Sequence, residues 1–157
     1  MRGFITSYKL NGIRQIWVAK GTKGIMKIKI GGSKNKLLKS LPHHITWYKI
    51  GNGVGHPMPD TILKDSLDLS SGTPFQRKVW RQIAKIPKGE TRTYTWLAKM
   101  TGRPKAGRAA ANACGANPIP LLIPCHRVIR SDGTIGGFSG PLSLKKLLLR
   151  REGIRFD

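Results

Sequence analysis

The apolar and polar positions of the first fifty residues follow the pattern of short strands. Residues 3–10 and 13–19 are two apolar-rich stretches separated by Asn11-Gly12, a dipeptide typical of tight hairpin turns. Residues 25–30 alternate apolar and basic side chains, the pattern of an antiparallel strand with one buried face. Residues 45–50 are a further candidate strand. The pattern therefore predicts a small sheet near the N-terminus.

A helix and a loop accompany these strands. Residues 33–41 fit a short helix that Ser33 caps and Pro42 ends. Residues 51–59 are rich in glycine and proline, which favours a loop or linker. No catalytic group of side chains is found before this linker. We therefore expect an α+β chain with two domains: an α/β supporting domain over residues 1–70 and a mostly helical domain over residues 71–157.

The second part of the chain begins with a helix signal. Thr73 can cap a helix whose first turn contains Pro74. The apolar residues that follow have helical spacing and are Phe75, Val79, Trp80, Ile83 and Ile86. Pro87-Lys88-Gly89 ends this pattern. We interpret the apolar stripe as core and assign it no further role.

A helix-turn-helix is predicted next. The first helix covers residues 93–100 and ends at Thr101-Gly102, and Arg103-Pro104 opens the second, over residues 105–113. Nearly every side chain of the second helix is very small, and a single long arginine, Arg108, projects from it. Regulators with this motif usually offer several polar side chains to base edges. A helix with such small side chains predicts close contact with nucleic acid that does not depend on the base sequence.

The charge of the chain favours the same kind of partner. The formal net charge is +22, from 29 Lys and Arg against 7 Asp and Glu. No acidic residue precedes Asp60, and Glu90 is the one acid between Arg77 and Arg130. Such an excess suits a polyanion, and binding to DNA would then be strongly salt-dependent.

Other classes of protein are disfavoured. No stretch reaches the roughly 20 apolar residues of a membrane helix, and the N-terminus lacks the apolar core of a signal peptide. Two cysteines, Cys114 and Cys125, are few for a secreted disulfide scaffold, so we expect a reducing, cytoplasmic setting. Cysteines and histidines show no metal-ligand spacing, and no metal site is expected.

The candidate chemistry lies at Cys125. An apolar run leads to Pro124, which restricts the backbone just before the cysteine. A free thiol is a weak nucleophile until it loses its proton. His126 within reach, directly or through one water, and Arg127 two residues on would both favour the thiolate. On chemistry alone, a buried structural cysteine is the alternative interpretation.

Two motifs carry a resemblance to a known family. Pro124-Cys125-His126-Arg127-Val128, preceded by Asn117-Pro118-Ile119-Pro120, resembles the active-site signature of the methylated-DNA:protein-cysteine methyltransferases, or alkylguanine-DNA alkyltransferases. The likeness runs from about residue 73 to residue 153. It implies a ribonuclease H-like N-terminal domain and irreversible, single-turnover transfer of an alkyl group from O6-alkylguanine, and also O4-alkylthymine, in DNA. It implies no cofactor, because DNA is the alkyl donor, and a monomer that binds double-stranded DNA through the minor groove.

The resemblance also implies roles in the reaction. Cys125 matches the alkyl acceptor and His126 the base that deprotonates it. Glu152 matches the glutamate that orients the histidine, the usual third member of such a relay. Asn117 matches the asparagine that ties the turns before the cysteine.

Further roles concern the flipped nucleotide, which must leave the base stack before its O6 can be reached. Tyr94 matches the tyrosine that donates to guanine N3, and the carbonyls of Cys125 and Val128 would accept from the exocyclic amine. The Ser139 N–H would donate to O6, and the loop of residues 136–140, with Phe138, would form a pocket wall. Arg108 matches the finger arginine that fills the stack, and the small residues expected beside DNA are Ala106, Gly107, Ala109 and Ala111.

Two positions depart from the family pattern, and three alternatives remain. Phe138 stands where many members have tyrosine, and Pro141 where a second glycine is common. An alkyltransferase-like sensor that binds the lesion without transfer usually lacks the cysteine. A helix-turn-helix regulator is disfavoured by the bland second helix. A cysteine protease is disfavoured by the adjacent Cys125 and His126 and by the net charge.

Overall fold

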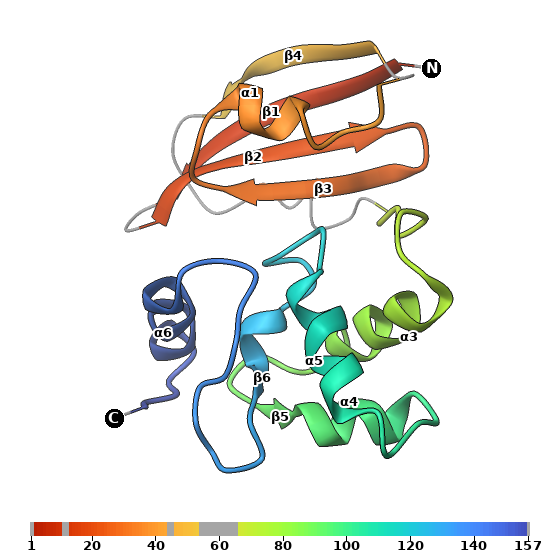
Figure 1. The fold of residues 1–157 in the computed structure, drawn as a ribbon. Helices are drawn as coiled ribbons and strands as arrows, with labels where there is room; N and C mark the ends of the chain where they lie inside the picture. The colour runs from red at the N-terminus through yellow and green to blue at the C-terminus, as the bar shows by residue number, and fades with distance from the viewer. Residues whose placement is uncertain (1, 11–12, 44–45, 54–65, 157) are drawn as a thin grey trace. The chain divides into compact units, whose positions relative to one another are not determined.

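The computed structural model describes residues 2–10, 13–43, 46–53 and 66–156. The chain folds as two compact units, residues 1–71 and residues 72–157, each described by itself below (Figure 1). The predicted Asn11-Gly12 turn and most of the predicted linker lie outside the described residues. Within the described part of the chain, no helix is long and apolar enough to cross a lipid bilayer.

The first unit contains a four-stranded sheet with the order β3-β2-β1-β4 (Figure 1). Its strands are β1 (Arg2–Leu10), β2 (Ile13–Gly21), β3 (Gly24–Ile30) and β4 (Thr46–Gly53). The first three pair antiparallel, as the alternation predicted, but β4 pairs parallel with β1, so the sheet is mixed. Residues 51–53 were predicted to begin the linker. They belong to β4 instead, because their backbone pairs with β1 despite the glycines.

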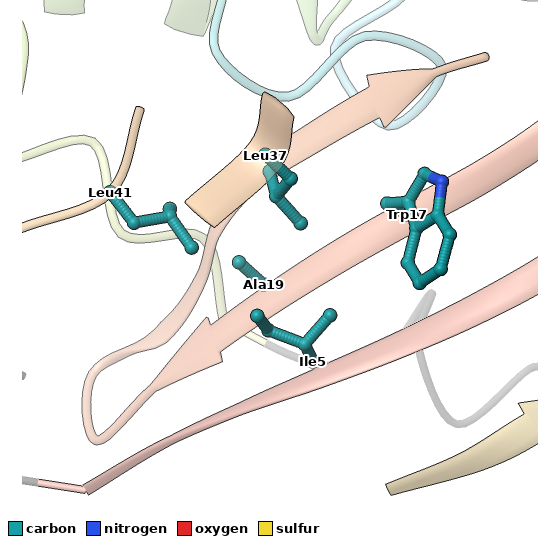
Figure 2. Close-up of a cluster of buried hydrophobic side chains, with 5 residues drawn as sticks. All are labelled: Ile5, Trp17, Ala19, Leu37 and Leu41. Carbon is teal, nitrogen blue, oxygen red and sulfur yellow. The ribbon is translucent and has the colours of Figure 1, made fainter. Parts of the chain in front are cut away.

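Helix α1 (Lys34–Leu38) covers one face of this sheet. Ser33 caps the helix as predicted, accepting the N–H of Lys36 at 3.4 Å, although the helix is shorter than residues 33–41. Leu37 of this helix forms a buried cluster with Leu41 and with three residues of the sheet, Ile5, Trp17 and Ala19 (Figure 2). Each fully buried leucine contributes about 2 kcal/mol of apolar burial, so this cluster attaches the short helix to the sheet.

The second unit is mostly helical (Figure 1). Its helices are α3 (Pro74–Ile83), α4 (Tyr94–Met100), α5 (Gly107–Gly115) and α6 (Leu142–Arg151). Along the chain, α5 is followed by the 3-10 turn η1 (Cys125–Arg127) and then by β6 (Val128–Ile129). Strand β6 pairs parallel with β5 (Arg92–Thr93), which precedes α4. With the N-terminal sheet, this arrangement confirms the predicted α+β class.

Helix α3 supplies the core of the second unit. Thr73 and Gln76 form a reciprocal capping box at its start, which satisfies two backbone donors. The Trp80 indole N–H donates to the carbonyl of Ala113 on α5 at 2.7 Å. The predicted stripe is buried at Val79, Trp80, Ile83 and Ile86. Its interpretation as core is therefore confirmed.

Helices α4 and α5 form the predicted pair, with a longer turn between them. Gly102 takes the left-handed conformation, φ 78°, that ends α4. Helix α5 begins at Gly107, so the prediction that Arg103-Pro104 opens a helix from residue 105 is wrong. The Arg103 N–H instead donates to the Ala98 carbonyl at the end of α4, and a separate turn is closed by the bond from the Ala106 N–H to the Arg103 carbonyl. The Arg103 guanidinium also stacks 5.3 Å from the centre of the Phe75 ring, outside the helix.

Candidate active site

A hydrogen-bonded turn over residues 119–123 directly precedes Pro124 and Cys125. The Ile123 N–H donates to the Ile119 carbonyl at 2.9 Å, and Leu121 between them has φ 78°, a left-handed conformation that costs a non-glycine residue about 1 kcal/mol. The buried Asn117 amide braces this turn. Its nitrogen donates to the Ile123 carbonyl at 2.8 Å and its oxygen accepts the Ile119 N–H at 3.0 Å. Asn117 therefore sets the backbone that precedes the cysteine.

Cys125 begins the η1 turn, and its thiol is free and completely buried. Its sulfur lies 3.7 Å from the Ser139 hydroxyl oxygen, and the Cys114 sulfur lies 3.8 Å from the Cys125 carbonyl oxygen. Contact with the Cys114 thiol has the largest effect on the Cys125 pKa and lowers it, while burial raises it. Bonds from Asn117 and Ser139 lower it further. The pKa settles at about 7, below the ordinary 9.0, so much of this thiol is ionised near neutral pH.

His126 follows Cys125 and is held by Glu152, the residue that caps the C-terminus of α6. The imidazole Nε2 lies 2.8 Å from Glu152 Oε1, and both side chains are largely buried. Beside a carboxylate, Nε2 carries the proton, which leaves the Nδ1 lone pair available. No group in the described part of the chain lies within hydrogen-bonding distance of that buried Nδ1. The Nδ1 lone pair is therefore free to accept a proton.

Arg127 is bonded to Glu152 and to the backbone rather than to the thiol. Its guanidinium donates to both Glu152 carboxylate oxygens, each at 2.9 Å, and to the Ile86 carbonyl at 2.7 Å. The Gly89 N–H also donates to Glu152, at 3.2 Å. The planar fork of Arg127 matches the carboxylate, so its contribution to the thiolate stays a prediction that rests on its charge and not on a bond to the sulfur. Sequence spacing could not reveal this pairing, since Glu152 lies 25 residues away.

The charges of this network follow from its contacts. Burial raises the pKa of the Glu152 carboxyl, but hydrogen bonds from Arg127 and then His126 outweigh it and lower the pKa to about 2. Burial lowers the pKa of His126, and the bond with Glu152 opposes this without cancelling it. At neutral pH the glutamate is therefore ionised and the imidazole neutral. A neutral base beside an easily ionised thiol is the arrangement that nucleophilic catalysis requires.

Lys145 is a functional candidate that the sequence did not indicate. It lies on α6 and is completely buried. Its ammonium donates to the Val128 carbonyl at 2.5 Å and to the Gly137 carbonyl at 3.0 Å. Burial lowers its pKa to about 8, although the thiols of Cys114 and Cys125 act in the opposite direction.

The remaining predicted pocket residues surround the glycine-rich loop. The Tyr94 hydroxyl donates to the Gly137 carbonyl at 3.0 Å. Burial raises the Tyr94 pKa to about 12, so this hydroxyl stays a donor at neutral pH. A side chain at Gly136 would meet this hydroxyl at 2.9 Å, which explains the glycine. Phe138 is half-buried and would contact any side chain at position 140.

The exposed face of α5 carries the predicted DNA-contacting residues. Arg108 and Ala109 are exposed, and Gly107 and Ala111 are partly exposed, whereas Ala110 is buried against the core. Ala106 caps the helix rather than lying within it. Arg108 is therefore the one long side chain of α5, and the other exposed residues of the helix are small.

Across the residues that the structure describes, no group of three or more His, Cys, Asp or Glu side chains could hold a metal ion.

Comparison with known proteins identifies the relationships of this site. Residues 74–154, which contain the Cys125–Glu152 site and both helices of the α4–α5 pair, match the model of the 6-O-methylguanine DNA methyltransferase, DNA binding domain, family. The chain belongs to this family. The resemblance drawn from the sequence motifs is therefore confirmed.

Relatives with curated names match a little over half of this chain. A probable methylated-DNA--protein-cysteine methyltransferase of Acanthamoeba polyphaga mimivirus is 58% identical over 85 residues, covering 54% of this chain and 56% of that protein. The bifunctional transcriptional activator/DNA repair enzyme Ada of Escherichia coli is 52% identical over 93 residues, covering 59% of this chain and 26% of Ada. The chain thus spans about half the length of the first of these relatives and about a quarter of the second.

Solved structures extend the likeness to the whole fold. The O6-methylguanine methyltransferase of Mycobacterium tuberculosis superposes with a TM-score of 0.69 at 24% identity, over 96% of this chain and 92% of that one. The O6-methylguanine-DNA methyltransferase of Pyrococcus kodakaraensis superposes with a TM-score of 0.66 at 23% identity, over 97% of this chain and 99% of that one. At this level of identity the comparison establishes the fold alone.

Proposed function

We propose that this protein repairs DNA by transferring the alkyl group of O6-alkylguanine, and of O4-alkylthymine, to Cys125 in a single irreversible turnover. The observation that carries the proposal is a buried thiol with a pKa of about 7 beside the His126–Glu152–Arg127 network, in a chain of the methyltransferase family. The second unit supplies both the DNA-binding and the acceptor residues, and the first unit supports it.

The reaction requires one displacement. His126 Nδ1 takes the thiol proton, directly or through one water, and Glu152 stabilises the imidazolium that forms. The Cys125 thiolate then attacks the alkyl carbon, and the S–C bond forms as the C–O6 bond breaks. The electron pair stays on the base, which takes up a proton to become guanine. The product is a thioether that no neighbouring group can cleave, so each molecule acts once and needs no cofactor.

DNA binding is proposed to place α5 in the minor groove without sequence preference. The small residues of its exposed face allow close approach, and Arg108 enters the stack in place of the extruded nucleotide. Tyr94 would release the Gly137 carbonyl to donate to guanine N3, and Ser139 would offer its N–H to O6. Because Cys125 is completely buried and its sulfur lies 3.7 Å from the Ser139 hydroxyl, entry of the base would require a shift of the groups that cover the sulfur. Donors already engage the Cys125 and Val128 carbonyls, so the exocyclic amine would use their second lone pairs.

Intact mass spectrometry tests the proposed function. The protein is mixed with a duplex containing one O6-methylguanine, and a matched duplex with unmodified guanine is the control. A mass increase of one CH2 group with the lesion alone, mapped to the peptide of Cys125, supports the proposal. Tight binding of the lesion without any mass increase would instead identify a damage sensor and refute transfer.

We predict that Arg108→Ala slows transfer from a lesion in duplex DNA by at least about tenfold, because extruding a paired base costs a few kcal/mol that the inserted side chain partly recovers. Transfer from the same lesion in a single strand should change much less, since no pair has to be opened. Single-turnover quenched-flow kinetics measure both rates. Lys88→Ala removes one exposed charge elsewhere in the unit and is the control. Equal slowing on both substrates would show that Arg108 contributes only charge.

A further inference from the structure

Lys145 is a buried cation that the proposed mechanism leaves without a role. No part of its surface is exposed, and within the described part of the chain no carboxylate lies at ion-pair distance from its ammonium. An unpaired buried charge is costly, and a lysine in such a place usually pairs with an anion or loses its proton. Its position on α6, between exposed Lys146 and half-buried Leu144, shows that the helix directs this one lysine inward.

The two bonds of Lys145 connect the elements that enclose the thiol. The Val128 carbonyl that it binds belongs to the residue directly after η1, and the Val128 N–H donates to the Cys125 carbonyl. The Gly137 carbonyl that it also binds lies two residues before Ser139, whose hydroxyl is 3.7 Å from the thiol. Lys145 thereby joins the cysteine turn, the glycine-rich loop and α6.

The groups that face Lys145 show which anion it accompanies. Cys114 from α5 and Cys125 from η1 both raise its pKa, and Arg130 beyond β6 lowers it. Lys145 in turn lowers the pKa of His126, which is neutral and therefore not its counter-ion. The Cys114 pKa is raised well above its ordinary value, chiefly by its bond with Cys125, so Cys114 keeps its proton. Arg127, the nearest cation in sequence, is committed to Glu152. Of the anions that can form around this ammonium, the Cys125 thiolate remains.

We propose that Lys145 is the buried counter-ion of the Cys125 thiolate and a positioning residue that holds the Val128 and Gly137 carbonyls around it. It touches neither substrate nor the reacting carbon, and it acts through the cysteine. This role rests on the proposed transfer to Cys125, but it concerns the ionisation of the thiol before DNA is bound. It can therefore be tested without DNA.

The experiment titrates the thiolate of Cys125 by its ultraviolet absorbance. The signal of Cys125 is the difference between each protein and the same protein carrying Cys125→Ser, which removes the contribution of Cys114. In wild type the midpoint is expected near the pKa of about 7. Cys114, Asn117 and Ser139 each lower the Cys125 pKa more than Lys145 does, so Lys145→Met should raise the midpoint by about half a pH unit and reduce the thiolate fraction at pH 6 about threefold. Lys146→Met, its exposed neighbour on α6, should leave the midpoint unchanged.

The titration separates a counter-ion from a merely structural lysine. A structural role would lower the melting temperature of Lys145→Met without moving the midpoint of its folded form, and that result overturns the proposal. Because no DNA is present, a shifted midpoint supports the role of Lys145 even if the protein transfers no alkyl group from a lesion. An unshifted midpoint overturns the role of Lys145 even if transfer is observed.

A second measurement applies if Lys145→Met does not fold. Coupling between two charges is reciprocal, so removing the thiolate must alter the lysine. Nuclear magnetic resonance of isotope-labelled lysine should give Lys145 a pKa of about 8 in wild type and a lower one in Cys125→Ser. An unchanged pKa in Cys125→Ser would show that the ammonium does not accompany the thiolate, and the proposal would be wrong.

Discussion

Replacing Cys125 with alanine is expected to abolish the mass increase that the protein gains from a duplex containing O6-methylguanine. The other thiol, Cys114, cannot take over. It is buried, its pKa lies well above the ordinary value, and its sulfur faces the Cys125 carbonyl rather than the loop of residues 136–140. A protonated thiol is a poor nucleophile. Intact mass measures transfer, and a fluorescence-anisotropy titration should show that the variant still binds DNA, because the exposed face of α5 is unchanged.

Cys114→Ala is the matched control for this experiment. It removes a buried thiol of the same size but should keep one alkyl group per protein. The pH dependence of transfer should move upward, because contact with Cys114 is the largest influence that lowers the Cys125 pKa. At acidic pH the variant is therefore slower, and at alkaline pH it approaches the wild-type rate. Retained transfer in Cys125→Ala, or complete loss in Cys114→Ala, would mean that the acceptor has been assigned to the wrong sulfur.

Local sequence signals were sufficient to predict most elements of the fold. Alternation of apolar and basic residues gave β3, and Ser33 and Thr73 gave the starts of α1 and α3, because capping depends on bonds within one helical turn. The boundaries that were wrong depend on distant contacts. Residues 51–53 became strand through pairing with β1, and the start of α5 moved to Gly107 while Arg103 stacked on Phe75.

Only those site residues that belong to a sequence motif of the family could be predicted. Cys125 and His126 are adjacent in sequence, and Glu152 and Asn117 were assigned by family resemblance rather than by spacing. Lys145 and the true partner of Arg127 could not be found this way. Helical spacing places Lys145 on the face of the buried Leu148 and Leu149, a signal that could have separated it from the exposed Lys146, but its bonds to the loop and to the residue after η1 depend on the fold. A long basic side chain reaches partners that sequence distance hides.

The second large effect is expected at Glu152, where one carboxylate holds both His126 and Arg127. Glu152→Gln keeps the shape but removes the negative charge, so the imidazolium formed during proton transfer and the Arg127 guanidinium both lose their counter-charge. The amide NH2 group must also face a donor from one of them. By analogy with loss of the carboxylate in Ser-His-Asp triads, we expect single-turnover transfer to slow by between about 100-fold and 10,000-fold.

Stability should fall as well, by about 2–4 kcal/mol, because Arg127 is left as a poorly compensated, largely buried charge. Glu90→Gln is the matched control. It breaks the ion pair of Glu90 with Arg92, at 2.6 Å, but that pair is about half exposed and should cost less than about 1 kcal/mol. Urea denaturation followed by circular dichroism compares the two variants. Equal losses of stability would show that burial of the Glu152 network contributes nothing.

The pH dependence of unfolding gives an independent check with a fixed sign. The folded-state pKa of Glu152 is about 2, below its ordinary value of 4.5. A carboxyl whose pKa is lowered by folding stabilises the protein fully above its unfolded pKa and loses that contribution as pH falls towards the folded one. Wild-type stability should therefore decline between about pH 4.5 and pH 2, and Glu152→Gln should decline less steeply over that interval. Parallel curves for the two proteins would mean that the carboxylate titrates normally in the fold, and that His126 and Arg127 do not hold it as its contacts indicate.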